Sequence, residues 1–304
     1  MKILRPALAA TLAASAAIGA GLAAAGPASA DAGAIQYVSK ILSGTPGHTV
    51  LGTVDCPVGT FVVSASASNV EVHQGAALPP GTIGGPITSL APLRNSRTSP
   101  GLANYTAVGV TGFFGTAAPG TLASVKVQAA CAPAARLSNA TSREITIAPD
   151  GHGARRGTVY CPAGMRAFGG GGHFLASDNH NSIGLEMYEN SVTADGTGWT
   201  FRGLARAGTD RLIVTTQCAP LVGSYVPAPS VPAPPQAPGY VSAGCSIGYT
   251  VLSGGVAFAH QDHTEGTGGV SETWTSAGGV GAGGYSYDDS QLIARAQCVP
   301  PGSF

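Results

Sequence analysis

The sequence predicts an all-β protein made of three similar disulfide-linked units, with little helix beyond the first thirty residues. Gly occurs 45 times and Pro 22 times among 304 residues, and apolar residues do not recur at helical spacing. Short β-favouring segments lie between clusters of Gly, Asn, Asp and Pro. The phrase GTVDCPVG (52–59) also returns as GTVYCPAG (157–164). A phrase repeated at such a distance indicates an internal structural repeat.

Residues 1–30 have the features of a bacterial signal peptide. Lys2 and Arg5 give a basic start, a stretch rich in Ala, Leu and Gly follows, and small residues at Ala28 and Ala30 mark a cleavage site. The sequence after residue 30 contains no run of about 18 apolar residues, so it predicts no membrane span. We therefore expect a secreted, extracellular chain of 274 residues, which is 304 less the first 30.

The charge pattern excludes several kinds of partner. Without Lys2 and Arg5 the 15 basic residues become 13, against 15 acidic ones, a formal net charge of −2. Charged residues make up 10% of the chain, far below the ~25% of ordinary globular proteins. No basic patch is present to neutralise phosphate groups, so we expect no nucleic acid binding. The lack of a further apolar run predicts no membrane insertion after cleavage.

Six cysteines divide the chain into three units. Each unit opens with a Cys followed three residues later by Gly, and closes with a Cys followed two residues later by Pro. Each repeat has room for about four short antiparallel strands. A Pro/Ala-rich linker between the second and third units is either an extended tether to a separate lobe or a strap across a shared core. The predicted division is a signal peptide at 1–30, β repeat 1 at 31–136, β repeat 2 at 137–220, a Pro/Ala-rich linker at 221–238 and β repeat 3 at 239–304.

The strand before each closing Cys alternates in polarity. Counting back from that Cys, the even positions are mostly apolar and the odd positions are mostly polar. Because residues two apart share one face of a strand, we expect the closing cysteines to point into the core and the odd positions to face outward. The odd positions include Lys126, Gln128, Gln217, Arg295 and Gln297.

Disulfides are the expected state of six cysteines in an exported chain. The simplest pairing joins the two cysteines of each unit: Cys56–Cys131, Cys161–Cys218 and Cys245–Cys298. The repeat favours this pairing because the same bond then occurs three times, although it is one of fifteen connectivities and the sequence leaves the others open.

The opening Cys-Pro-x-Gly, the Gly-rich strand after it and the closing strand that ends in Cys resemble the vitelline membrane outer layer family. The pattern also resembles uncharacterised secreted bacterial proteins built from such units. The resemblance implies a β-prism, with three sheets around a pseudo-threefold axis, and an extracellular binding or coat role. The third unit departs from the pattern with Ser246 in place of Pro. The matching residues are Cys56, Pro57, Gly59, Cys161, Pro162 and Gly164.

Three aromatic residues are candidates for ligand binding. Tyr105 and Trp199 follow related phrases in the first two units, and Trp274 is the plausible counterpart in the third. Aromatic rings stack on sugars, so these residues suggest a carbohydrate ligand. The alternative is that they belong to the core, where large aromatic side chains usually lie.

A cluster of imidazole and carboxylate groups is a candidate metal site. His260, Asp262 and His263 lie within the phrase AHQDHTE, and both residue types are good ligands for zinc. The alternative is a polar loop between strands, because single His/Asp motifs are permissive. We expect no cofactor.

The leading functional hypothesis is a secreted, non-catalytic binding or surface-structural module, with cell-wall or other carbohydrate, or an extracellular protein, as its partner. No thiol nucleophile is left, because all six cysteines are expected to be paired. The alternatives are a metal-binding module and a secreted polysaccharide hydrolase that uses paired carboxylates. Candidate carboxylates for the hydrolase are Asp178, Glu186, Glu189 and Asp262.

Overall fold

The structure, a computed structural model, is all-β in the residues that it describes, which confirms the predicted fold class. Its strands pair in antiparallel fashion, and a single-turn 3-10 helix, η1 (Ala134–Leu137), accompanies them. None of the helical residues described forms a helix long and apolar enough to cross a membrane. The described residues are 35–44, 49–70, 87–93, 107–113, 123–137, 139–151, 153–175, 181–182, 184–205, 208–220, 224–227, 231–232, 239–258, 268–276, 278–286 and 291–300.

The strands fall into three consecutive segments of the chain. The first segment contains β1 (Gln36–Gly44), β2 (Thr49–Asp55), β3 (Thr60–Val70), β4 (Ile87–Leu93), β5 (Ala107–Phe113) and β6 (Ala123–Pro133). The second contains β7 (Thr141–Ile147), β8 (Ala154–Tyr160), β9 (Arg166–Leu175), β10 (Asn181–Ser182), β11 (Gly184–Val192), β12 (Gly198–Ala205) and β13 (Arg211–Ala219). The third contains β14 (Ser224–Pro227), β15 (Val231–Pro232), β16 (Gly239–Gly244), β17 (Thr250–Phe258), β18 (Gly268–Ser276), β19 (Gly279–Ser286) and β20 (Gln291–Val299).

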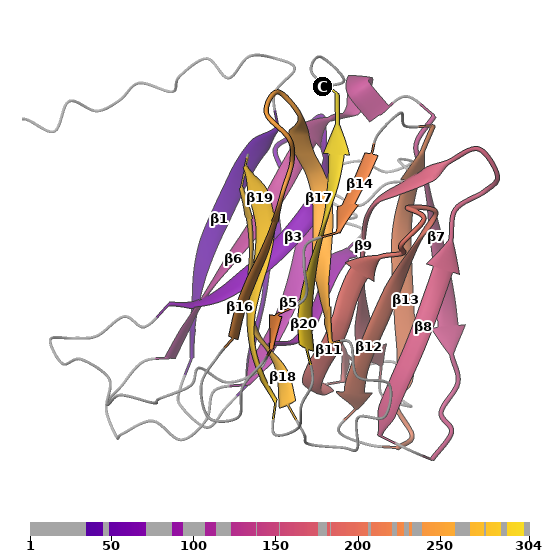
Figure 1. Ribbon diagram of the computed structural model, residues 1–304. Helices are drawn as coiled ribbons and strands as arrows, with labels where there is room; N and C mark the ends of the chain where they lie inside the picture. Colours follow the sequence, from indigo (N-terminus) through magenta and orange to yellow (C-terminus); the bar gives the residue numbers. More distant parts are fainter. Residues whose placement is uncertain are drawn as a thin grey trace, which may run out of the picture. The chain divides into compact units, whose positions relative to one another are not determined.

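The same pairing pattern occurs in all three segments (Figure 1). In the first segment, β6 lies between β1 and β3, and β5 lies between β2 and β4. The corresponding orders are β7-β13-β9 with β8-β12-β11 in the second segment, and β14-β20-β17 with β16-β19-β18 in the third. Each segment thus has six main strands instead of about four, because two strands precede each opening Cys.

The segments are joined through equivalent strands. The fourth strand of the first segment, β4, pairs with β9 of the second, and β11 of the second pairs with β17 of the third. At the remaining junction, the Ala67 amide of β3 donates to the Thr273 hydroxyl of β18 over 2.9 Å. The hydroxyl groups of Ser64 and Thr275 lie 3.0 Å apart at the same junction. The third segment therefore contacts the first, which links the three segments in a cycle.

The three segments also share a core. One residue in each of β3, β9 and β17 is left unpaired beside the closing Cys, because the register shifts there: Val63, Phe168 and Leu252. These bulge residues are fully buried and belong to a single apolar cluster with Phe61 and Leu137. A β-bulge turns an extra side chain out of the regular alternation. The repeated bulge thus sends one apolar residue from each segment into the same cluster.

The Cys-x-x-Gly phrase forms the same turn in each segment. Gly59, Gly164 and Gly248 have φ angles of 83°, 80° and 89°, and the following residue donates its amide to the carbonyl three positions earlier. These are features of a type II turn, which needs Gly at its third position. The first position supplies only a carbonyl, so Ser246 replaces Pro without changing the turn.

The predicted disulfides are confirmed. The bonds are Cys56–Cys131, Cys161–Cys218 and Cys245–Cys298, with Cα–Cα distances of 5.7, 5.6 and 5.6 Å. The closing cysteines are buried, as the alternation of the closing strands predicts. Three disulfides are typical of proteins that lie outside the cytoplasm.

The expected outward orientation of Gln217 and Gln297 is wrong, because both side chains are buried. Gln217 donates from Nε2 to the Val62 carbonyl of the neighbouring segment, and Gln297 accepts a 2.8 Å bond from the Ser253 hydroxyl. They lie next to the bulges, where both faces of the closing strand are covered. Buried amides need such partners, since an unpaired one costs about 1–3 kcal/mol.

The described parts of the predicted linker do not form a free tether. Strand β14 pairs with β20 from Ser224–Cys298 to Pro227–Arg295 (Figure 1). Strand β15 pairs with β20 beyond it. The tract therefore crosses the third segment and provides its first strand. The strap alternative is the one that the structure supports.

The Gly-rich part of β9 lies against aromatic rings. A Cβ atom added at Gly170 would lie 2.3 Å from Cγ of Trp199, and one at Gly172 would lie 2.3 Å from Cγ of Phe201. Both rings belong to β12 of the same segment. These glycines are explained by close packing of large side chains on the strand backbone.

Candidate functional site

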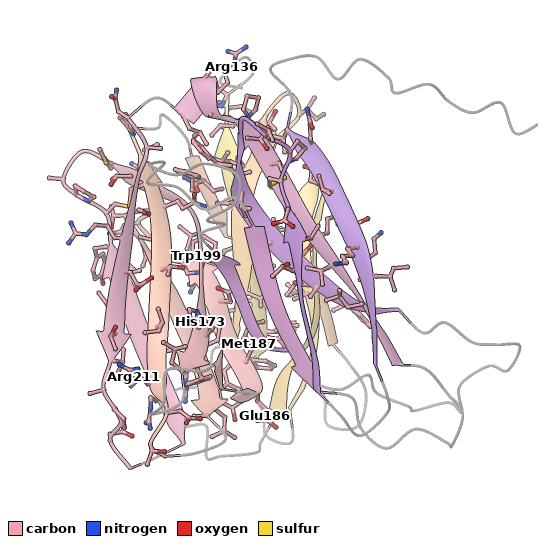
Figure 2. All side chains as sticks on the ribbon, turned by 180° about the vertical axis from the view of Figure 1, so that it is seen from behind. Arg136, His173, Glu186, Met187, Trp199 and Arg211 are labelled. Atoms are coloured by element: carbon pink, nitrogen blue, oxygen red, sulfur yellow. A yellow bond between two sulfur atoms is a disulfide. The ribbon has the colours of Figure 1, made fainter. Side chains whose placement is uncertain are left out.

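Trp199 is a core residue, so its predicted role as an exposed sugar-stacking ring is wrong. Its exposed fraction is 2%, and the indole N–H donates a 2.7 Å hydrogen bond to Oδ1 of Asn190 (Figure 2). Trp274 is in β18, opposite Gly281, and its role stays a prediction. Tyr105 lies outside the described residues.

The predicted metal ligands His260, Asp262 and His263 lie outside the described residues. Within the part of the chain that the structure describes, no group of three His, Cys, Asp or Glu side chains is close enough to hold one ion. Of the carboxylates assigned to a hydrolase, Asp178 and Asp262 also lie outside the described residues, whereas Glu186 and Glu189 are in β11.

Glu186 and Glu189 have different surroundings. Glu186 accepts a 2.5 Å hydrogen bond from the hydroxyl of Tyr188, and burial raises the pKa of its carboxyl above the ordinary value despite that bond. Glu189 is buried and lies 3.3 Å from Nη2 of Arg156 and 3.6 Å from Nη1 of Arg295. Neither residue is the plain exposed strand position that its polar sequence suggests.

A cavity of about 440 Å³ lies over Glu189. Three strands of the second segment bring side chains to it because alternate residues of a strand share a face. Thr158 of β8 is opposite Thr200 of β12, which is opposite Ser191 of β11, and the two threonine hydroxyls lie 2.9 Å apart. The residues that line the cavity are Arg156, Gly157, Thr158, Tyr160, Glu189, Thr193, Ala194, Thr200 and Arg295.

Arg295 reaches the cavity from the third segment. It belongs to β20 and is opposite Gly255 of β17, and β17 lies between β20 and β11 in the sheet. Its Nη1 nevertheless donates to the Ser191 hydroxyl over 3.0 Å and to the Val192 carbonyl over 3.3 Å, both on β11. The guanidinium therefore crosses β17 at a residue without a side chain. The cavity thus lies at the junction of the second and third segments.

The cavity combines charge with hydroxyl groups. Arg156 and Arg295 carry two positive charges against the single negative charge of Glu189, so these lining residues have a formal charge of +1. Tyr160 is 58% exposed and adds an aromatic ring. Binding sites for small ligands combine a few placed polar groups with such rings.

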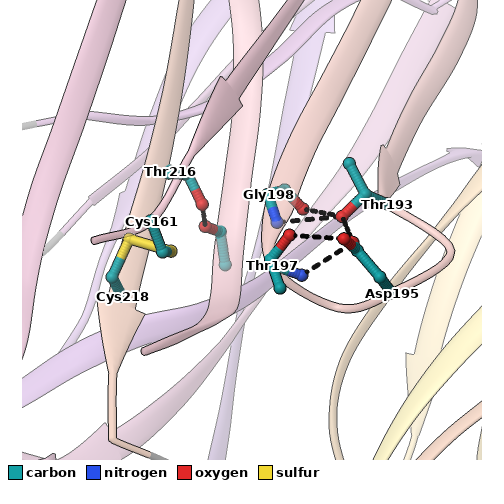
Figure 3. Close-up of a disulfide and its surroundings, with 8 residues drawn as sticks. Cys161, Thr193, Asp195, Thr197, Gly198, Thr216 and Cys218 are labelled. Atoms are coloured by element: carbon teal, nitrogen blue, oxygen red, sulfur yellow. Dashed lines mark hydrogen bonds between the residues drawn. A yellow bond between two sulfur atoms is a disulfide. The ribbon is translucent and has the colours of Figure 1, made fainter. Parts of the chain in front are cut away.

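The hairpin turn between β11 and β12 forms one rim of the cavity. Asp195 accepts hydrogen bonds from the hydroxyls of Thr193 and Thr197, at 2.6 and 2.7 Å, and from the Thr197 amide at 3.0 Å (Figure 3). These bonds lower the pKa of Asp195 to about 2. The Thr197 carbonyl also accepts a 2.8 Å bond from the amide of disulfide-bonded Cys161. The rim is therefore held in place before any ligand arrives.

His173 on β9 is a half-buried imidazole outside the cavity (Figure 2). Its Nδ1 has no hydrogen-bond partner in the described part of the chain, and burial lowers its pKa from 6.5 to about 4. Because the unfolded chain takes up the proton at higher pH than the folded one, stability falls as the pH decreases from about 6.5 to 4. The loss attributable to His173 is about 3 kcal/mol, since each pKa unit corresponds to ~1.4 kcal/mol.

We expect His173→Gln to remove most of this loss. Urea unfolding of the two proteins at pH 7, 5.5 and 4 measures it, because other titrating groups are common to both. An equal decrease in the free energy of unfolding in the two proteins would show that His173 is not the responsible group.

No known family model matches the chain, and no curated protein is significantly similar to it.

Proposed function

We propose that the protein is a secreted, non-catalytic binding module that recognises carbohydrate through the cavity over Glu189. The main support for this proposal is the set of residues that line the cavity. They place two arginines, one carboxylate, three threonine hydroxyls and an exposed tyrosine around one hollow. Sugar rings offer hydroxyl groups to such polar side chains and a C–H face to an aromatic ring. The hollow is of the size of known small-ligand sites, about 300–1,000 Å³.

The same lining speaks against the hydrolase alternative. Glycosidases use two carboxyl groups, one to donate a proton and one to act as base or nucleophile. Of the described residues that line the cavity, Glu189 alone carries a carboxylate, and it is paired with two guanidinium groups. The lining therefore does not supply the pair of carboxyl groups that this mechanism needs.

The proposed module is secreted and is stabilised by its disulfides and its repeated strand order. Residues 1–30 act as a cleaved signal peptide, and the three disulfides suit an oxidising extracellular environment. The recurring strand order supports a threefold repeat, and the cyclic contacts between segments agree with a β-prism-like arrangement. Such a scaffold holds a binding surface without the need for a flexible active site.

Tyr160 provides the direct test. We expect Tyr160→Ala to weaken retention of the oxidised mature protein on the insoluble glycan that it binds, among chitin, cellulose and peptidoglycan, by about tenfold. Loss of an aromatic anchor from a binding site commonly costs 1 kcal/mol or more, and ~1.4 kcal/mol is tenfold in affinity.

Tyr240 is the matched control, because it is 57% exposed against 58% for Tyr160 and does not line the cavity. Tyr240→Ala should leave retention unchanged. Equal effects of the two substitutions would place the binding surface elsewhere, and no retention of the parent protein on any glycan would reject carbohydrate recognition.

A further inference from the structure

The two cavity arginines use only part of their hydrogen-bonding capacity. A guanidinium carries five N–H donors in a planar fork that fits a carboxylate. Among the described residues, Arg156 contacts Glu189 through Nη2, and Arg295 makes its contacts through Nη1. In the part of the chain that the structure describes, the other N–H groups of these two cavity-lining side chains have no protein partner.

Glu189 is the less accessible partner of this cluster. Its side chain is 9% exposed, whereas that of Arg156 is 63% exposed. Its Oε1 also lies 3.3 Å from the Ser191 hydroxyl, which donates to it. A ligand that enters the cavity therefore meets guanidinium donors and a net positive charge, with the compensating carboxylate buried beneath them.

The guanidinium pair occurs at one of three equivalent junctions. The residue five positions before the opening Cys is Leu51, Arg156 or Tyr240 in the three segments. The residue three positions before the closing Cys is Gln128, Thr215 or Arg295. At the junction of the second and third segments these two positions are both Arg, while the matching pairs are Leu51 with Thr215 and Tyr240 with Gln128. The scaffold alone therefore does not require the pair.

We propose that the cavity selects an acidic saccharide, whose carboxylate is held by Arg156 and Arg295 while its hydroxyl groups meet the threonines and its ring meets Tyr160. This inference rests on the proposed function and specifies its ligand class. A bare anion uses the arginines alone, whereas a uronic acid also uses the hydroxyl and aromatic lining. Because the arginine pair occurs at one of the three equivalent junctions, we expect one such site per chain.

Calorimetric titration of the oxidised mature protein with oligogalacturonate and with its fully methyl-esterified form tests the inference. The two ligands share a sugar backbone and differ only in the masked carboxylates. We expect a stoichiometry of one and an affinity for the acid at least about tenfold higher than for the ester, because a charge-assisted hydrogen bond contributes more than a neutral one. Added salt should weaken binding of the acid.

Arg156→Gln tests the site itself, and we expect the variant to fold normally because the Arg156 side chain is largely exposed. We expect it to weaken binding of the acid by about tenfold, and Arg156→Lys to retain part of the affinity. Arg143→Gln is the control, because Arg143 is an exposed arginine of β7 outside the cavity. An equal loss in the two glutamine variants would overturn the assignment.

Comparison of the ligands separates acid selectivity from carbohydrate binding in general. Equal binding of acid and ester would overturn acid selectivity and leave carbohydrate binding standing. Binding of inorganic phosphate as tight as that of the acid would show a simple anion site. Absence of binding to the acid, the ester and the insoluble glycans would overturn both the inference and the proposed function.

Discussion

Joint replacement of Cys161 and Cys218 by alanine is expected to reduce the free energy of unfolding by about 4 kcal/mol. The bond closes a loop of 57 residues, and the chain-entropy model gives this value for a loop of that length. The corresponding decrease in Tm is roughly 10 °C for a chain of this size. Thermal unfolding followed by circular dichroism, in matched oxidised samples, measures it.

The position of this disulfide adds a second effect. The Cys161 amide donates to the Thr197 carbonyl in the turn that forms the cavity rim. We therefore expect glycan binding to weaken in the same variant at temperatures where it is still folded. Unchanged stability after removal of the bond would contradict the view that Gly-rich segments need these cross-links.

Replacement of Gly255 by alanine is expected to destabilise the protein by about 3 kcal/mol or more. An added Cβ would lie 2.0 Å from the carbonyl oxygen of Asn190 and 2.4 Å from Cα of Ser191. Both atoms are backbone atoms of the second segment, so neither can rotate away. Overpacking of this kind costs about 1–3 kcal/mol, and more where the neighbour cannot move. Urea unfolding at neutral pH gives the difference.

Gly278→Ala is the matched control for this substitution. Among the residues that the structure describes, its chain neighbours apart, none has an atom within 4 Å of the Cβ that it would add, and its φ angle is not in the left-handed region. We expect a change of less than about 0.5 kcal/mol, as for most surface substitutions. If both alanine variants were equally stable, the close approach of β17 to β11, and with it the path of Arg295 into the cavity, would be wrong.

Local sequence signals predicted the parts of the fold that depend on local chemistry. The type II turns need Gly at one position, which is why Gly59, Gly164 and Gly248 were visible as a motif. The disulfides followed from the repeated placement of two cysteines in each unit. The buried glutamines were missed because their burial depends on contacts between segments, which alternation within one strand does not reveal.

The cavity was not predicted from the sequence for a related reason. Arg156 and Arg295 are far apart in the chain and meet only because β11 pairs with both β12 and β17. The available signals were the polar alternation of Arg156, Thr158 and Tyr160 before the opening Cys, and the outward position of Arg295. The sequence left both roles of Trp199 open, because an aromatic residue in a polar phrase has the same pattern whether its ring is exposed or bonded to Asn190 in the core.

Titration of the ¹⁵N-labelled mature protein with oligogalacturonate, followed by amide chemical shifts, tests the assignment of the cavity most directly. We predict that the shifted amides concentrate at residues 156–160, at Thr200 and in the turn from Thr193 to Thr197. Shifts that concentrate instead at the exposed turn residues Val58 and Ile247, or no shifts at saturating concentrations of ligand, would contradict the account.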